Sequence, residues 1–171
     1  MLEIIRKRRS IRSYFEKEIE EDKITEILKA AMFSPTARAL RPWEFIIVKD
    51  SANKKRLSQA TPYASFAKNA PIIIIIAYDT DKGNRFKEDC SIAAGHVYLE
   101  AVNQDLGTCY IQISDGAEGS KGDPEAYVKE ILDIPDHIRV HCLMPLGYPS
   151  KHHEPHKDTE FQESKIHYEK Y

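Results

Sequence analysis

The feature that most constrains the fold is an unbroken apolar run from Pro71 to Tyr78, with the sequence PIIIIIAY. It has the length of a β-strand and lacks the polar alternation of a strand with one wet face. The run therefore predicts a strand that is buried on both faces. It is far shorter than the roughly 20 residues that a membrane-spanning helix requires, so we expect no membrane partner.

Length and charge favour an ordinary folded protein. A chain of 171 residues fits one domain, which can bury roughly 70% of its unfolded surface. With 42% hydrophobic residues, 30% charged residues and a net charge of -2, it differs from disordered, fibrous and general nucleic-acid-binding chains. The N-terminal sequence MLEIIRKRRS is the reverse of a signal peptide, so a cytoplasmic location is the default expectation.

The cysteines and histidines do not form a recognisable metal motif. Cys90, Cys109 and Cys142 are widely spaced without a CxxC pair, and we expect them to be reduced and buried. The run HHEPH at 152–156 has ligand-type side chains, but Pro155 breaks helical register and no carboxylate or cysteine set accompanies it. We therefore expect no metal.

Hydrophobic periodicity predicts a mixture of helices and strands. Apolar residues recur at helical spacing over 21–33 and 89–104, and a later helix begins with Asp123 as its N-cap and Pro124 in its first turn. His96 and Glu100, one turn apart, are interpreted as a structural pair. The remaining strands are predicted at 45–48, 108–113 and 139–146.

The chain beyond Gly147 is polar and cannot form a core of its own. Its apolar residues are few and spaced apart. Either this tail frays, or its apolar residues dock on another surface, which a second subunit can supply. These residues are Phe161, Ile166, Tyr168 and Tyr171.

A basic cluster follows a short N-terminal helix. Three guanidiniums and one hydroxyl lie within five residues, RRSIR at 8–12. Guanidinium forks and a serine donor suit a phosphate group. The alternative is a solvated basic face. A nucleic-acid patch is disfavoured, because the chain is net negative and the cluster is short.

A second segment, SPTARALRPW at 34–43, joins the helix at 21–33 to the first strand. Two prolines stiffen it, and its small residues leave backbone amides free to approach a planar ligand. The alternative is a stiff connector in which Trp43 packs into the core. The chain has no GxGxxG, P-loop or nucleophile elbow, so Rossmann, NTPase and hydrolase readings lack their defining motifs.

Taken together, RRSIRSY and SPTARALRPWEFIIV resemble the paired signature of the nitroreductase family. DCSIAAGHVYLEAVNQDLGTCYIQ resembles the central helix and following strand of that family, LMPLGYP its last core strand, and FQESKIHYEKY its C-terminal arm. The resemblance covers nearly the whole chain in the order of the family.

The resemblance implies an α+β flavoprotein fold with a central mixed sheet flanked by helices. Residues 1–171 form one domain in an interlocked homodimer, and residues 150–171 are an arm that packs on the partner subunit. FMN lies at the subunit interface, so the site draws on both chains.

Matching positions imply the site residues. The FMN phosphate and ribityl chain are held by Arg8, Arg9, Ser10 and Arg12. The flavin ring is lined by Pro35, Thr36, Ala37 and Ala39 of the other subunit. Strand-end backbone near the ring comes from Ile111, Gln112 and Ile113. Gly147 begins a turn that leads to a further basic phosphate contact, either His156 or Lys157.

Two departures from the family pattern bear on redox tuning. Ala39 and Arg41 stand where the family usually has Asn and Gln, and Gln112 and Ile113 stand where glycine or glutamate is common. Three roles remain open for Arg41: it adds positive charge near the ring, recognises an acidic substrate, or pairs with a surface carboxylate.

The implied activity is that of an FMN oxidoreductase. NADH or NADPH delivers hydride to the flavin, and an oxidised small molecule such as a nitroaromatic or a quinone then takes its place in a ping-pong cycle. The cofactor carries the chemistry, so no catalytic side chain is expected. The alternatives are a specialised branch with dehalogenation or oxygen-dependent chemistry, and a flavin-binding protein without turnover.

Overall fold

The computed structural model describes residues 1–114 and 116–171, and it confirms the α+β class. The helices are α1 (Leu2–Lys7), α2 (Glu21–Met32), α3 (Ser51–Leu57), α4 (Phe86–Asn103) and α5 (Pro124–Leu132). The strands are β1 (Trp43–Val48), β2 (Ile72–Asp79), β3 (Gly107–Thr108), β4 (Ile111–Gln112) and β5 (Ile138–Gly147). Short 3-10 turns are η1 (Ala37–Ala39), η2 (Ser65–Asn69), η3 (Thr80–Lys82), η4 (Asp158–Glu160) and η5 (Glu163–Lys165).

The strands form one sheet in the order β1-β2-β5-β3, and β4 also pairs with β5. The pairings between these strands are antiparallel. The parallel component of the expected mixed sheet is limited, in the described chain, to an isolated bridge between Ser10 and Thr108. The single strand expected over 108–113 is interrupted, because the Tyr110 amide donates to the Tyr98 hydroxyl (2.6 Å) instead of to a strand.

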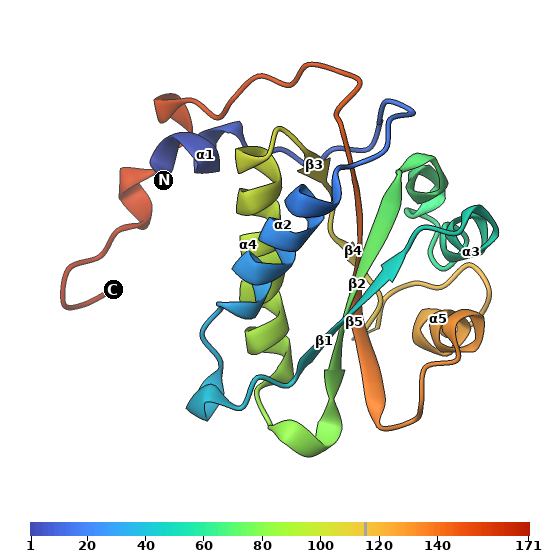
Figure 1. Ribbon diagram of the computed structural model, residues 1–171. Helices are drawn as coiled ribbons and strands as arrows, with labels where there is room; N and C mark the ends of the chain where they lie inside the picture. The colour runs from blue at the N-terminus through green and yellow to red at the C-terminus, as the bar shows by residue number, and fades with distance from the viewer. Residues whose placement is uncertain (115) are drawn as a thin grey trace.

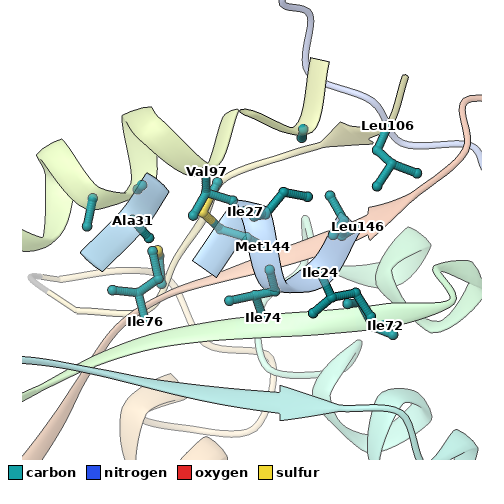
Figure 2. Close-up of a cluster of buried hydrophobic side chains, with 14 of the residues drawn as sticks. Ile24, Ile27, Ala31, Ile72, Ile74, Ile76, Val97, Leu106, Met144 and Leu146 are labelled. Atoms are coloured by element: carbon teal, nitrogen blue, oxygen red, sulfur yellow. The ribbon is translucent and has the colours of Figure 1, made fainter. Parts of the chain in front are cut away.

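The predicted double burial of β2 is confirmed. Ile72, Ile74 and Ile76 belong to the core cluster under α2 and α4, which Figure 2 shows. Ile73 and Ile75 point to the opposite face and join the cluster under α3 and α5. Figure 1 shows one helical layer on each side of the sheet. Burying one isoleucine side chain contributes roughly 1.5–3 kcal/mol, so this run is a large part of the driving force.

Helix α3 was not predicted from the hydrophobic periodicity of the sequence. Leu57 is its one buried residue, so the helix carries no apolar stripe. Its start is set by a capping interaction instead, since Asp50 Oδ1 accepts from the Asn53 amide at 2.8 Å. In α5 the predicted cap is confirmed, with Asp123 accepting from the amides of Glu125 and Ala126.

The expected pairing of His96 with Glu100 is wrong. His96 Nδ1 lies 2.7 Å from the Ser34 hydroxyl, across to the end of α2. The Glu100 carboxylate instead accepts from the side-chain amides of Asn103 and Gln104. Tertiary packing of α4 on α2 offers His96 a buried hydroxyl, which replaces the neighbour along its own helix.

The cysteines are placed as the sequence predicts. Cys90, Cys109 and Cys142 are free and buried, as expected. Burial raises the pKa of Cys90 to about 12, which keeps its thiol protonated at neutral pH. Among the described residues, no helix is long and apolar enough to cross a bilayer.

The first part of the polar tail packs on the N-terminal segment of its own chain. The Ser150 amide donates to the Ser13 carbonyl (3.1 Å), and the His156 amide donates to the Arg6 carbonyl (2.8 Å). Arg6 also pairs with Asp158. Beyond residue 160 the side chains are exposed, and the red ribbon of this arm leaves the body of the protein in Figure 1.

A buried carboxylate ties α5 to the sheet. Glu125 accepts from Arg139 through both oxygens at 2.7 Å, and its Oε1 also accepts from the Val140 amide at 2.8 Å. Desolvation raises the pKa of Glu125, but the hydrogen bonds from Arg139 and Val140 outweigh it, so that the pKa lies below its ordinary value. The glutamate is therefore ionised in the folded protein at neutral pH.

Replacing Glu125 by Gln should lower the free energy of unfolding by about 1–3 kcal/mol at neutral pH, since the arginine loses its charged partner. Because about half of the Arg139 side chain is exposed, we expect a smaller loss of stability than for a fully buried ion pair. The loss of stability is measured by unfolding the protein in urea and monitoring the fluorescence of Trp43. Glu130→Gln, an exposed change on the same helix, is the control.

The same interaction should depend on pH. Because the folded-state pKa lies below the unfolded value of about 4.3, the stabilisation is complete above about pH 4.3 and is lost as the pH falls through the folded-state pKa. The gap in stability between wild type and Glu125→Gln should therefore shrink in acid. A gap that stays constant from neutral to strongly acidic pH would contradict the assignment.

Candidate functional site

Two glycines let the N-terminal segment approach the end of the sheet. Gly107 and Gly147 face each other across β3 and β5. A Cβ on Gly107 would lie 2.3 Å from Cγ1 of Ile11, and one on Gly147 would lie 2.9 Å from Cδ1 of Tyr14 and 2.5 Å from Cδ of Pro71. Any side chain at either position would therefore push away the segment that carries the basic cluster.

The close approach is fixed by hydrogen bonds. The Ile11 amide donates to the Thr108 carbonyl at 2.9 Å. The Tyr14 hydroxyl donates to the carbonyls of Ile11 (2.6 Å) and Pro145 (3.0 Å). Burial raises the pKa of Tyr14 well above its ordinary value, so the hydroxyl remains a donor. Residues 10–14 are thereby held on the edge formed by β3 and β5.

The structure brings Arg8, Arg9 and His156 together. Arg8 Nη2 lies 3.2 Å from His156 Nε2, and its guanidinium is 5.3 Å from the centre of the Tyr98 ring. Arg9 donates to the Glu154 carbonyl at 2.7 Å. Of the two basic residues proposed after Gly147, His156 is the one beside Arg8. Lys157 is exposed, and its amide donates to Glu160.

Ser10 and Arg12 continue this cluster toward a cavity. The Ser10 hydroxyl lies 3.4 Å from the Tyr98 hydroxyl, and Arg12 Nη1 lies 3.4 Å from the Ser10 carbonyl. In the part of the chain that the structure describes, Arg8, Arg9 and Arg12 form no ion pair with a carboxylate. Their positive charges are therefore available to an anion.

Arg12 lines a cavity of about 310 Å³. Its volume lies at the lower end of the range of roughly 300–1,000 Å³ for small-molecule sites. The wall combines polar side chains with aromatic rings, and the Arg12 guanidinium is 5.9 Å from the centre of the Phe66 ring. The lining residues from the strand region are Cys109, Tyr110, Ile111 and Gln112, and those from the preceding loop are Thr61, Tyr63 and Phe66.

Some of the other residues that we expected near the flavin line the cavity, and others are buried in the core. Gln112 is exposed at the cavity, and its side-chain amide donates to the Ser114 carbonyl at 3.0 Å. Ile111 lines the cavity although its side chain is buried, and Ile113 is fully buried in the core. Gly147 ends β5 in a tight contact, so packing accounts for this glycine.

The second motif, by contrast, lies away from the basic cluster. Pro35, Thr36, Ala37, Ala39 and Arg41 belong to the loop around η1, below the lower end of α2 in Figure 1. The basic cluster follows α1 at the top of the same view. One copy of the chain therefore does not bring the two motifs together.

Tyr98 is the site residue that sequence reasoning missed, because its spacing placed it among the apolar residues of α4. Its hydroxyl accepts from the Tyr110 amide and lies beside Ser10, while its ring faces Arg8. Burial raises the pKa of Tyr98, which keeps the hydroxyl neutral. The aromatic residues Tyr63 and Phe66 were also missed, since no motif marks their segment.

Replacing Gly107 by Ala should lower the free energy of unfolding by about 1–3 kcal/mol, because the new methyl group displaces Ile11. Amide hydrogen exchange should show faster exchange at Ile11, whose N–H bonds to Thr108. Gly83→Ala is the matched control, since its Cβ would make only ordinary contacts of 3.5 Å or more. Unchanged exchange at Ile11 in Gly107→Ala would refute the packing role.

Comparisons with known proteins identify the family to which this fold belongs. The Nitroreductase family model matches residues 5–62 and 58–148. The FMN-dependent nitroreductase of Clostridium difficile R20291 is similar over all of both chains, with 35% identity and a TM-score of 0.95. A protein of Methanothermobacter thermautotrophicus, provisionally named NADH dehydrogenase/NAD(P)H nitroreductase, is 34% identical over all of this chain and 87% of its own.

A more distant relative is the iodotyrosine deiodinase of Thermotoga neapolitana, with 21% identity over 87% of this chain and 88% of its own. The matches to the family model and to the two more similar proteins include the N-terminal basic segment, helix α4 and strand β5. The chain belongs to the nitroreductase family.

Proposed function

We propose that this protein is a homodimeric oxidoreductase that binds FMN and passes reducing equivalents from NADH or NADPH to a small oxidised acceptor, such as a nitroaromatic or a quinone. The observation that carries the proposal is the cluster of Arg8, Arg9 and Arg12, in which no guanidinium forms an ion pair within the described residues and Arg12 lines a cavity. Family membership supports the oxidoreductase class.

The residues present fit a phosphate. Arg8 and Arg9 are half-buried, Arg12 is exposed at the cavity, and the Ser10 hydroxyl adds a neutral donor. His156 supports Arg8, because its Nε2 accepts from the Arg8 guanidinium at 3.2 Å while its Nδ1 donates to the Glu160 carboxylate at 2.7 Å. Unpaired, partly desolvated guanidiniums are costly unless an anion meets them, and a phosphate accepts several such donors at once.

The cavity beside Arg12 suits the planar part of the cofactor. Tyr63, Phe66 and Tyr110 give it aromatic walls, and Gln112 places a polar group at its edge. When bound, FMN supplies the hydride chemistry, accepting reducing equivalents from the nicotinamide and giving them to the acceptor. The side chains orient the ligands and exclude water. Because one cavity serves both donor and acceptor in this proposal, they bind in turn, as in a ping-pong scheme.

A second copy of the chain explains why the two motifs lie apart. The loop with Thr36 and Ala37 lies at the other end of the subunit from the basic cluster (Figure 1). In the proposed homodimer, this loop of one subunit lines the flavin that the basic cluster of the other subunit holds. Each flavin site is then built from two chains.

Two large apolar side chains, one on α4 and one just after α2, are exposed to solvent. Cys90, Ala93 and Val97 pack into the core, while Ile92 on the other side is 40% exposed. Phe33, which follows the neighbouring α2, is 80% exposed. In the proposed homodimer, a subunit interface along this side of α4 covers these residues.

The exposed arm provides the second contact between subunits. Phe161 is 68% exposed and Tyr168 is 85% exposed. Ordering such an arm costs about 1–2 kcal/mol of backbone entropy per residue, so these side chains need pockets on a partner. We propose that residues 150–171 include a strap that packs on the other subunit from about residue 160 onward.

Replacing Arg12 by Ala should raise the dissociation constant for FMN roughly tenfold to a hundredfold, because one charged hydrogen-bonding partner of the phosphate is lost. Fluorescence titration of FMN into the stripped protein measures this. Arg56→Ala, an exposed change on α3, serves as the charge-matched control. Unchanged affinity in both Arg8→Ala and Arg12→Ala proteins would remove the phosphate assignment.

Deleting residues 159–171 should weaken the dimer and reduce FMN retention together, since both depend on the same interface. Light scattering gives the mass and flavin absorbance gives the FMN content of the same samples. A full-length protein that holds stoichiometric FMN as a monomer would refute both the strap and the shared site.

Steady-state kinetics distinguishes an enzyme from a flavin-binding protein without turnover. FMN-loaded protein should oxidise NADH or NADPH continuously when a nitroaromatic or quinone is added. If FMN binds tightly but neither nucleotide is oxidised with any acceptor, the protein is a flavin-binding protein and the proposed enzymatic function fails.

A further inference from the structure

The loop that follows α2 is held in an unusual backbone conformation. Arg38, Ala39 and Arg41 have φ angles of 56°, 56° and 51°, which lie in the left-handed region. None of them is glycine, and such residues cost of order 1–3 kcal/mol each unless their surroundings hold them. Strain of this kind is retained where the backbone must present groups in a set direction.

Helix α4 and the loop itself hold this conformation. The Ala37 amide donates to Oδ1 of Asp89 at 2.9 Å, and Asp89 is only 4% exposed. The Arg41 amide donates to the Thr36 hydroxyl at 3.0 Å, and the Ala39 amide donates to the Thr36 carbonyl at 3.0 Å. The backbone is therefore ordered from both ends, although its side chains face solvent.

Within the residues that the structure describes, the two arginines of this loop have no acidic partner. Both Arg38 and Arg41 are exposed, and within the described residues neither forms an ion pair. Within the described residues, Arg41 therefore has no surface carboxylate to pair with, which was the third role considered for it.

The acids beside the loop are already engaged. The Asp79 amide donates to the Pro42 carbonyl, which places Asp79 at the end of the loop. Lys82 lies 3.2 Å from the Asp79 carboxylate and 3.0 Å from that of Glu44, and these contacts raise the pKa of Lys82. Asp89 is directed at the Ala37 amide. As far as the described residues go, the two arginines therefore carry positive charge that no carboxylate compensates, on a backbone held by hydrogen bonds.

We propose that Arg38 and Arg41 form an oxyanion-recognition pair at the mouth of the flavin cleft. The pair binds a carboxylate or phosphate on the molecule that reacts there, either an anionic acceptor or the 2′-phosphate of NADPH. This inference rests on the proposed function, in which the loop lines the flavin of the other subunit. Guanidinium forks match both groups, and a rigid loop lowers the entropy lost when they bind.

The test uses oxidised, FMN-loaded dimer and binding without turnover. Isothermal titration measures two matched pairs of ligands, benzoate against benzamide and NADP⁺ against NAD⁺. For each pair, the affinity ratio is the affinity for benzoate or NADP⁺ divided by that for benzamide or NAD⁺. In the wild type, at least one of these two ratios should exceed one. In Arg38→Gln/Arg41→Gln that affinity ratio should fall at least tenfold, since charged hydrogen bonds are lost. The single variants should show smaller decreases.

Two further variants show whether the effect belongs to the pair. Arg56→Gln on α3 removes an exposed charge elsewhere and should leave both ratios unchanged. Arg41→Lys keeps the charge but loses the planar fork, so its ratio should lie between those of wild type and Arg41→Gln. A fall in the benzoate ratio identifies an anionic acceptor, and a fall in the NADP⁺ ratio identifies the nucleotide phosphate.

The inference is overturned if wild type prefers neither anion, or if both ratios are unchanged in the double variant. FMN content, measured by absorbance on the same samples, separates this result from failure of the proposed function. Wild type that retains no FMN overturns both. Unchanged ratios in a fully loaded dimer overturn the arginine pair alone.

Discussion

Burial of β2 on both faces is the constraint on which the rest of the structure depends. Its isoleucines point alternately into two cores, so the chain must place α2 and α4 on one side and α3 and α5 on the other. Strand β5 pairs along the whole length of β2 and carries the sheet on to β3 and β4. The end of β5 is consequently a rigid edge on which a site can be built.

At that edge, packing and charge have different roles. Gly107 and Gly147 leave room for the N-terminal segment, and Tyr98 links α4 to Ser10 and to the backbone of Tyr110. These contacts satisfy the backbone, and the arginines of the segment form no ion pair with a carboxylate among the described residues. The result is a firmly held set of positive charges, which is the arrangement that preorganised anion binding requires.

The same separation of roles recurs in the loop after α2. Asp89 is buried and engages an amide, whereas Arg38 and Arg41 are exposed and free of acidic partners in the described chain. The loop and the basic cluster stand at opposite ends of one subunit (Figure 1). Uncovered apolar residues on α4, near the end of α2 and in the C-terminal arm are consistent with a second subunit that brings the two ends together.

The sequence alone determined the mixture of helices and strands, the doubly buried strand, the capped helix α5 and the family signatures, and the resemblance carried by those signatures implied the α+β fold. These depend on local periodicity, capping chemistry and residue order, which the chain displays directly. Only the tertiary structure decided that His156 rather than Lys157 meets Arg8, that His96 bonds Ser34, and that Tyr98 joins the site. Such contacts join residues far apart along the chain, and their partners are chosen by how helices and strands pack, which no local pattern encodes.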